Sequence, residues 1–350
     1  MRLSAVFACL RLLSEAVSTL PLDTFHREDG ARRPFRPRPT YLDFRAPQVS
    51  RIDYLSQVML SLLTDGNAFV LTPRDGMGVT SNLHVLDPSM VTIRFAGGRA
   101  EYVVSGVPEP LGPGEIMHIK GMTLPGQLRG VSPLEAARDV VDGGRKAQDF
   151  GTSFMANNAM PPGVIEMPDD PIGNGRERAR AVAEAWNESH GGTANAGKVG
   201  VLLGGASLKT IAIKPTDAEW LDSKRFGVSE IARFYGVPPH LIADASNSTS
   251  WGSGLAEQNL AFGQFSLRPW IERIEDAHNR LLVSDGLAKA FIKLNLDALL
   301  RASLADRYAS YAIGIGNRFL HPNEARRFED LEPLPDGDQW PDSPEVSHEP

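Results

Sequence analysis

Two helices that each begin with a capping sequence define the plan of this chain. Ser132 and Thr216 each stand three residues before a glutamate, at the start of a stretch with helical spacing. In such a capping box the two side chains satisfy free N–H groups of the first helical turn. The sequence therefore predicts helices over 132–158 and 216–235. The residues between them, 159–215, are an insertion that leaves from the first helix and returns through the second.

The other segments mix helical and strand periodicity, which predicts an α+β fold of two or three domains over the 350 residues. Apolar residues at helical spacing predict helices over 5–20, 52–64, 174–189, 255–282, 299–319 and 323–328. Short apolar or alternating stretches between turn residues predict strands over 22–26, 67–72, 83–86, 90–95, 102–104, 116–120, 164–166, 197–203, 208–213 and 291–296.

Three places interrupt these patterns. Residues 30–39 contain four arginines and three prolines, which predicts a loop. Gly143 and Gly144 lie inside a predicted helix, where each costs about 1 kcal/mol relative to alanine. We expect the helix to kink there or another segment to pack closely against it. Pro269 lies inside the long helix 255–282 and predicts a kink there, because its ring clashes with the preceding turn.

Composition excludes several classes of protein. The net charge of −7 argues against a protein that wraps DNA by neutralising phosphates. Six acidic residues lie in residues 331–350 without any Lys or Arg, so the rest of the chain is close to neutral. That tail is also rich in proline, which predicts disorder. The amino terminus is expected to be an amphipathic helix, not a signal peptide, and no apolar run is long enough to span a membrane.

A search for catalytic or metal-binding patterns finds none. Cys9 is the single cysteine, which excludes an intrachain disulfide and indicates a small core residue. Gly252-Ser253-Gly254 lacks the five-residue form of a serine nucleophile elbow. No histidine stands three to five residues from another, and residues 200–205 lack the Gly-Lys-Ser/Thr end of a phosphate loop. The sequence therefore predicts no enzyme, no catalytic residue, no metal site and no cofactor.

Several segments, taken together and in order, resemble one family. The residues that carry the resemblance are 4–13, 20–22, 130–134, 154–163, 234–242 (Phe-Tyr-Gly-Val-Pro-Pro-His-Leu-Ile), 259–275 and 319–326. They are similar to the corresponding segments of the HK97-type bacteriophage portal protein family, and the resemblance covers about residues 3–338. The family commonly has a longer amino-terminal segment, whereas this sequence starts almost on the first helix.

The resemblance implies a portal fold and a ring, commonly of twelve subunits, at one vertex of the capsid. Such a ring is a channel for DNA packaging and ejection. The implied partners are the major capsid protein, the terminase large subunit, a head–tail adaptor and double-stranded DNA that passes through without sequence specificity. The implied location is the virion, after synthesis in the host bacterial cytoplasm. The particle is a virus or a gene transfer agent.

The parts of a portal subunit can be placed on the predicted segments. The expected division is an α/β wing over 1–130, a helical stem over 131–158 and 216–238, a small α/β clip over 159–215, a tunnel loop region over 239–256, a long kinked helix and wing strand over 257–298, a helical crown over 299–330, and the acidic tail over 331–350.

Two sets of candidate site residues follow from this division. The expected channel-facing loop is small, polar and almost uncharged, so it can touch DNA without holding it. Its residues are Asp244, Asn247, Ser248, Thr249, Ser250, Trp251 and Ser253, with Trp251 expected to anchor the loop against the long helix. Aromatic residues on helices are candidates for subunit interfaces, and each could equally be an ordinary core residue: Trp220, Phe226, Phe234, Tyr235, Phe262, Phe265 and Trp270.

Two other functions stay open on the sequence alone. One is another virion component of the head–tail connector, although the length of 350 residues and the long kinked helix are unusual for an adaptor. The other is an intracellular hydrolase built from dispersed Ser, His and Asp residues. Electron microscopy separates them, because a ring with a central hole indicates a portal and a monomer with a deep cleft indicates an enzyme.

Overall fold

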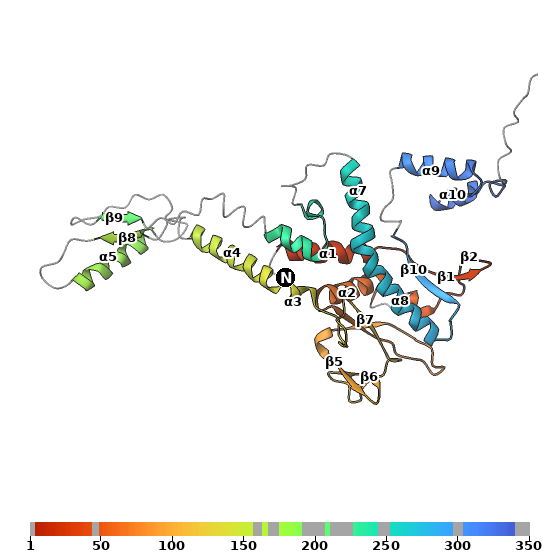
Figure 1. Cartoon of the computed structure of the whole chain (residues 1–350), viewed down its shortest axis with the longest axis horizontal. Coiled ribbons are helices and arrows are strands. Elements are labelled where there is room, and N and C mark those ends of the chain that lie inside the picture. Colours follow the sequence, from red (N-terminus) through yellow and green to blue (C-terminus); the bar gives the residue numbers. More distant parts are fainter. Residues whose placement is uncertain are drawn as a thin grey trace, which may run out of the picture. The chain divides into compact units, whose positions relative to one another are not determined.

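The computed structural model describes residues 4–43, 49–156, 163–166, 175–190, 207–210, 227–243, 253–296 and 304–339. The chain divides into two compact units, one ending at Leu294 and one beginning at Asn295, and each is described by itself. Helices and strands alternate along the chain (Figure 1), so the predicted α+β class is confirmed.

The core of the first unit is the contact between α1 (Ser4–Ser18) and α2 (Arg51–Thr64). Both helices bury one apolar stripe, as their 3.6-residue periodicity requires. The buried apolar side chains are Val6, Leu10, Leu13 and Val17 on α1, and Leu55, Val58, Met59, Leu62 and Leu63 on α2. Each contributes about 1.5–3 kcal/mol when fully buried. Cys9 lies in the same contact, and burial raises the pKa of its thiol to about 11, which makes it an inert core residue.

A three-stranded antiparallel sheet is formed by β1 (Leu22–Glu28), β2 (Ala31–Pro34) and β10 (Ala290–Leu294), in the order β10–β1–β2. The loop predicted for residues 30–39 is therefore wrong at its start. Asp29 and Gly30 both have positive φ, 49° and 79°, which is the geometry of a two-residue hairpin turn. The arginines and prolines that follow concealed this Asp-Gly signal.

The second sheet and its neighbouring hairpin form a smaller core. β3 (Asn67–Leu71) lies between β4 (His84–Leu86) and β7 (Ile116–Lys120), and β5 (Val91–Ala96) pairs with β6 (Arg99–Val104). All these pairs are antiparallel. Their shared cluster of buried side chains is Phe69, Val91, Tyr102, Val104 and Ile116. Short 3-10 turns, η1 (Thr40–Leu42) and η2 (Pro88–Met90), join the elements of this region.

The first capped helix begins as predicted. The backbone N–H of Glu135 donates to Ser132 Oγ at 3.0 Å, and α3 (Pro133–Ala136) follows. A break at Ala137 separates α3 from α4 (Arg138–Ala156). The predicted interruption is therefore misplaced, because α4 runs through Gly143 and Gly144 as one helix. No atom of the described chain lies within 4 Å of a Cβ built at Gly143.

The inserted unit is described in part. β8 (Gly163–Glu166) pairs antiparallel with β9 (Ser207–Thr210), and α5 (Gly175–His190) lies between them in sequence. The strand expected over 197–203 and the start of the second capped helix, 216–226, lie outside the described residues. Residues 227–235 are helical, as predicted for the end of that helix.

The long helix of the first unit has three parts: α7 (Ser253–Ala261), a π-helical stretch η5 (Phe262–Leu267) and α8 (Arg268–Ser284). The interruption predicted at Pro269 is confirmed, but it begins seven residues earlier. Proline has no N–H to donate and its ring crowds the carbonyl four residues before it. The wider π turn relieves both problems by moving the hydrogen bonds to the fifth residue.

The second unit contains α9 (Leu304–Gly316) and α10 (Pro322–Phe328). Arg307 binds both carboxylate oxygens of Glu329 at 2.8 Å, and Tyr311 Oη donates to the same carboxylate at 2.9 Å. The expected disorder is wrong for residues 331–339. Asn323 donates to Leu334 O, accepts from Leu334 N and donates its own N–H to Gly337 O, so this segment folds back on α10. Residues 340–350 lie outside the described part.

The end of α2 meets the start of α3 where three glycine backbones come together. Gly121 N donates to Gly66 O at 2.8 Å, and a Cβ on Gly130 would lie 2.3 Å from that same oxygen. Asn67, fully buried, closes the junction: its Oδ1 accepts from Gly130 N at 2.6 Å and its Nδ2 donates to Gly130 O at 3.1 Å. Ser132 Oγ then donates to the last turn of α2 at Thr64 O. The direction of α3 therefore depends on glycine at these three positions, because a side chain would prevent the close approach.

Gly66→Ala tests this junction. A Cβ on Gly66 would lie 2.1 Å from Val131 O, and the residue has φ +80°. Gly98 has the same φ of +80° with nothing within 4 Å, so Gly98→Ala is the matched control. We expect Gly98→Ala to lower the free energy of unfolding by about 1 kcal/mol, the cost of left-handed backbone alone. Gly66→Ala should cost at least about 3 kcal/mol in urea unfolding, because the clash is added. Equal decreases for the two variants would contradict the close contact.

Buried polar side chains fasten α8 to the rest of the first unit. His278 Nδ1 donates to Ile274 O at 2.7 Å, which leaves Nε2 to accept from Tyr54 Oη on α2 at 2.9 Å. Glu275, 4% exposed, accepts from Leu294 N at 2.8 Å and pairs with Lys293, both on β10. Each of these groups is satisfied, as burial of a polar atom requires.

Acid should weaken the His278 link. Burial lowers the pKa of His278 from 6.5 to about 4, so the folded chain holds this side chain neutral. A depressed histidine pKa gives stability that is complete above pH 6.5 and is lost as the pH falls toward 4. The decrease from this group is about 3 kcal/mol, from about 1.4 kcal/mol per pK unit. In urea unfolding between pH 7 and 4, His278→Gln should remove that part of the dependence. His84→Gln, at an exposed position, should keep it. An unchanged pH dependence in His278→Gln would refute the assignment.

Candidate functional site

The candidate channel loop lies between two described ends. Asp244, Asn247, Ser248, Thr249, Ser250 and Trp251 are outside the described residues. The segment before them ends at Ala243, which has φ +62°, and the segment after them begins with Ser253 at the start of α7. The structure thus describes what holds the loop at both ends.

The first end rests on the helical core. The helix of residues 227–235 buries Ile231, Ala232 and Tyr235, and Tyr235 Oη lies 3.5 Å from Leu63 O of α2. Gly236, with φ +64°, ends this helix, and Val237 N donates back to Ala232 O at 2.9 Å. This is the usual glycine stop of a helix. The 3-10 turn η4 (Pro239–Ile242) follows and contacts α1.

Two side-chain bonds tie this end to the other. His240 Nε2 lies 3.1 Å from Asn259 Oδ1 on α7, and Ser266 Oγ of the π-helical stretch donates to Gly236 O. A Cβ on Gly236 would lie 3.2 Å from Ser266 Oγ, so this approach also uses glycine. The base of the loop is therefore a closed clamp in which the segments before and after the loop are bonded to each other.

The predicted interface aromatics divide by burial. Tyr235 and Phe262 are each 7% exposed, so for these two residues the structure favours the alternative of an ordinary core residue. Phe265 and Phe234 are 72% and 46% exposed. Trp270 is partly covered, with its ring beside Gly121. Trp220 and Phe226 lie outside the described residues. Periodicity places a residue on a helix face, but only the packing decides whether that face is covered.

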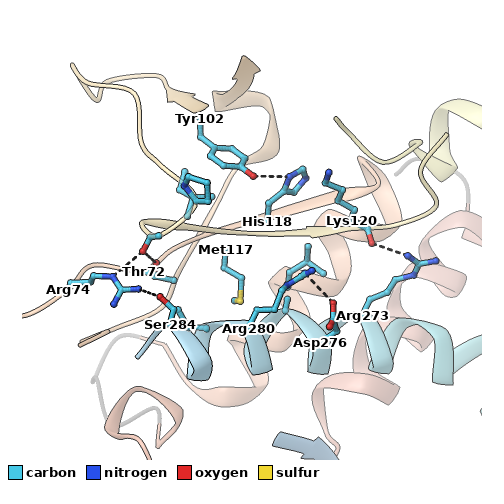
Figure 2. A pocket seen from close by; sticks show the side chains of 16 residues that line it. Thr72, Arg74, Tyr102, Met117, His118, Lys120, Arg273, Asp276, Arg280 and Ser284 are labelled. Carbon is cyan, nitrogen blue, oxygen red and sulfur yellow. Dashed lines mark hydrogen bonds and ion pairs between the residues drawn. The ribbon is translucent and has the colours of Figure 1, made fainter. Parts of the chain in front are cut away.

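A groove of about 480 Å³ lies between β7 and α8 (Figure 2). Arg74, Lys120, Arg273 and Arg280 line it, together with Asp276. Three of the four cations are used within the chain. Arg74 binds Asp285 at 3.0 Å, Arg273 donates to Gly121 O at 2.9 Å, and Arg280 pairs with Asp276 at 3.2 Å. The arginines that line the groove therefore mainly serve to hold α8 and its neighbouring segments together.

His118 at the rim of this groove is a neutral structural residue. Its ring stacks on Phe69 with centroids 4.4 Å apart, and its Nε2 lies 3.0 Å from Asn67 Oδ1. Burial, together with nearby Lys120, Arg129 and Arg280, lowers its pKa to about 3. Figure 2 shows Tyr102 directed at its other nitrogen, at 3.5 Å. A histidine that stays neutral and has both nitrogens occupied lacks the properties of a general base near pH 7.

The described residues contain no group of three His, Cys, Asp or Glu side chains that could hold a metal ion. Among the helices in the described ranges, none is long and apolar enough to cross a membrane. Sequence reasoning missed Asn67, His278 and the clamp at Gly236. The only local signal was the Gly-Val-Pro-Pro stretch after Tyr235, which marks a helix end but not its partners.

Comparisons with known proteins identify the family. The family model described as phage portal protein matches residues 4–330. The chain is 42% identical over 353 residues to the probable portal protein of Streptomyces phage phiC31, covering 96% of this chain and 76% of that protein. It is 33% identical over 348 residues to the portal protein of Enterobacteria phage HK97, covering 97% of this chain and 81% of that protein.

Solved structures agree on the fold. A chain from the neck of a native gene transfer agent particle, computed with C12 symmetry, has a TM-score of 0.64 at 24% identity and covers 95% of this chain and 91% of its own length. An HK97 family phage portal protein from Corynebacterium diphtheriae has a TM-score of 0.63 at 19% identity. The match covers 85% of this chain and 94% of that protein. Matched over almost its whole length by the family model and by two curated relatives, the chain belongs to the phage portal protein family.

Proposed function

We propose that twelve copies of this chain form a ring that conducts double-stranded DNA into and out of a capsid. Portal proteins are structural and form homo-oligomeric rings in virions, so the hydrolase alternative is excluded. The proposed number of twelve subunits is supported by the shared fold with a chain from the neck of a gene transfer agent particle, which was computed with C12 symmetry. Rings close when each subunit offers two different, complementary surfaces to its neighbours.

Exposed apolar side chains support burial against neighbouring copies. In the first unit, Leu260 and Phe265 on the long helix are 56% and 72% exposed. In the second unit, the described helices bury few large side chains, and most of the large apolar residues on them or between them are exposed: Leu304, Tyr308, Ile313, Phe319 and Phe328. A unit of this size cannot bury a sufficient core alone. Contacts between subunits would cover these surfaces.

Phe265→Asp should prevent ring formation, because a charge would be buried in the contact without a partner. The matched control is Met77→Asp, at the end of a turn, where the side chain is 85% exposed. Light scattering and negative-stain electron microscopy should show rings for the wild type and for Met77→Asp, and subunits or open fragments for Phe265→Asp. Intact rings from Phe265→Asp would remove this residue from the interface. A wild-type protein that stays monomeric at high concentration would contradict the proposed ring.

We infer that residues 243–253 face the channel, as the tunnel loop. The clamp of Gly236, His240, Asn259 and Ser266 would hold both ends of the loop in place while its tip meets DNA. The composition supports weak contact. Asp244 is the only charged residue, and Asn247, Ser248, Thr249 and Ser250 are small and polar. Such side chains offer hydrogen bonds to phosphate without neutralising it. Trp251 would anchor the loop.

Replacing Asn247, Thr249 and Ser250 with lysine should slow DNA movement, because each added cation attracts phosphate. Rings should still assemble, since the clamp is untouched. In a packaging assay the triple variant should package at least about tenfold less DNA at low salt, with partial recovery as salt screens the added charges. The matched control replaces the same residues with glutamine. Normal packaging and retention of DNA by the lysine variant would show that the loop does not line the channel.

The partners can be assigned to parts of the chain as proposals. The unit of β8, α5 and β9, inserted between the two stem helices, would be the clip that meets the terminase large subunit and the head–tail adaptor. The region of α1, α2 and the first sheets would be the wing, in contact with the major capsid protein. The helices α9 and α10 would form the crown. Synthesis in the host cytoplasm fits a chain with a single cysteine that is buried and unpaired.

A further inference from the structure

The hairpin of β1 and β2 is unusually rich in arginine. Five arginines lie between residues 27 and 38, in a chain whose first 330 residues are nearly neutral. β2 is an edge strand, and all four of its residues are exposed. Arg38 is the exception within this group, because it is held by Leu22 O and Asp43. The other four project from or beside the hairpin.

The strand register places two of these arginines on one face with two aromatic rings. Arg27 lies opposite Arg32, and Phe25 lies opposite Phe291. Residues directly opposite, or two apart along a strand, share a face of the sheet. The Arg32 guanidinium lies 4.8 Å from the Phe25 ring centroid and the Arg27 guanidinium 5.9 Å from that of Phe291, with the two rings 6.1 Å apart. We call these four residues the arginine face.

The opposite face of the same sheet is the one that packs into the core. Leu22 and Thr24 on β1, and Ile292 and Leu294 on β10, are all buried. Arg33 is on that side of the hairpin and is paired with Glu28 at 3.0 Å. By contrast, neither Arg27 nor Arg32 has an ion pair with a carboxylate among the described residues.

Stability alone does not explain two exposed arginines side by side. Like charges directly opposite on an antiparallel pair destabilise the sheet by several tenths of a kcal/mol. The cation–π contacts return about 0.5–1 kcal/mol each at an exposed site, but glutamine in place of one arginine would keep the other contact and avoid the repulsion. The two tilted rings also limit where the guanidinium groups can lie, which leaves two planar forks on the same face for a ligand.

We propose that the arginine face binds the phosphate backbone of duplex DNA. Arg27 and Arg32 lie directly opposite each other, so two positive charges on one face meet the dense negative charge of a nucleic-acid backbone. Planar guanidinium forks bind phosphate oxygens with two hydrogen bonds each. The inference rests on the proposed function, because the conducted DNA is the polyanion that every subunit meets. Arg36, also exposed, lies just beyond the hairpin and extends the positive charge.

The contact would be independent of sequence and weak in one subunit. Repetition around a ring raises the effective affinity, because one duplex can reach several copies at once. The arginine face thus adds a second kind of DNA contact to the uncharged loop. The loop lets DNA slide, whereas the arginine face holds it by charge and releases it as salt increases.

The test is DNA binding by purified rings of the variant Arg27→Gln/Arg32→Gln. With a fluorescent 30-base-pair duplex at low salt, we expect at least about tenfold weaker binding. The slope of log K against log salt should become shallower by about 0.9 for each phosphate that is no longer neutralised. Arg33→Gln, on the opposite face of the same hairpin, is the matched control and should bind within about twofold of the wild type. Arg27→Lys/Arg32→Lys should keep most of the binding.

Several results would overturn the inference. Rings of Arg27→Gln/Arg32→Gln that bind DNA like the wild type would refute it, as would equally weakened binding by Arg33→Gln. Tighter binding to vesicles with anionic lipid than to DNA, through the same arginines, would assign the face to a membrane. If Arg27→Gln/Arg32→Gln alone fails to form rings, the face is an assembly contact. Urea unfolding should show this variant folded, with a loss of at most about 2 kcal/mol from the two cation–π contacts. If the wild type itself forms no ring, the proposed function fails, but the DNA measurement still tests the arginine face.

Discussion

The approach of three backbones at Gly66, Gly121 and Gly130 is the constraint on which the first unit depends. The carbonyl of Gly66 accepts from Gly121 and leaves no room for a side chain on Gly130. Asn67 completes the contact with two hydrogen bonds to Gly130. These bonds join the end of α2, the end of β7 and the start of α3 within a few ångströms. The helix α3 is therefore joined to α2 and β7 by backbone geometry, which allows little variation in its direction.

The second constraint is the long helix, which is both interrupted and firmly held. Pro269 forces the π-helical stretch before it, and that stretch places Ser266 against Gly236 at the base of the loop. Beyond the proline, α8 is fastened by the buried pair of His278 and Tyr54 and by Glu275. The same helix is thus bonded to Gly236 at the base of the proposed tunnel loop and to β10 near its other end. Such a helix can transmit a load only if its buried polar groups remain paired.

Several arginines of the first unit serve the fold. Arg74, Arg129 and Arg273 each bind a carboxylate or backbone carbonyls of the same unit. A protein that conducts DNA needs few free cations along the path, because strong attraction to phosphate would slow sliding. Against this background the arginine face of the β1–β2 hairpin is exceptional. Its cations contact aromatic rings and not carboxylates, which keeps their charge available for a ligand.

The sequence alone determined the helices, most strands, the cap at Ser132, the interruption at Pro269 and the family resemblance. Except for the resemblance, which rests on several segments along the chain, these features depend on residues within about four positions of each other, where propensity and capping act directly. Local spacing also carried the hairpin turn at Asp29 and Gly30, although the neighbouring prolines concealed it. Local propensity was misleading at Gly143 and Gly144. Glycine disfavours helix, yet α4 continues through both residues.

Only the tertiary structure decided which faces are covered. It buried Tyr235 and Phe262, left Phe265 exposed, and folded residues 331–339 back on α10. It also paired Asn67 with Gly130 across 63 positions and Tyr54 with His278 across 224. The physical reason is that burial and polar pairing depend on segments that meet in space. The apolar pattern of one segment does not predict which distant segment will pack against it.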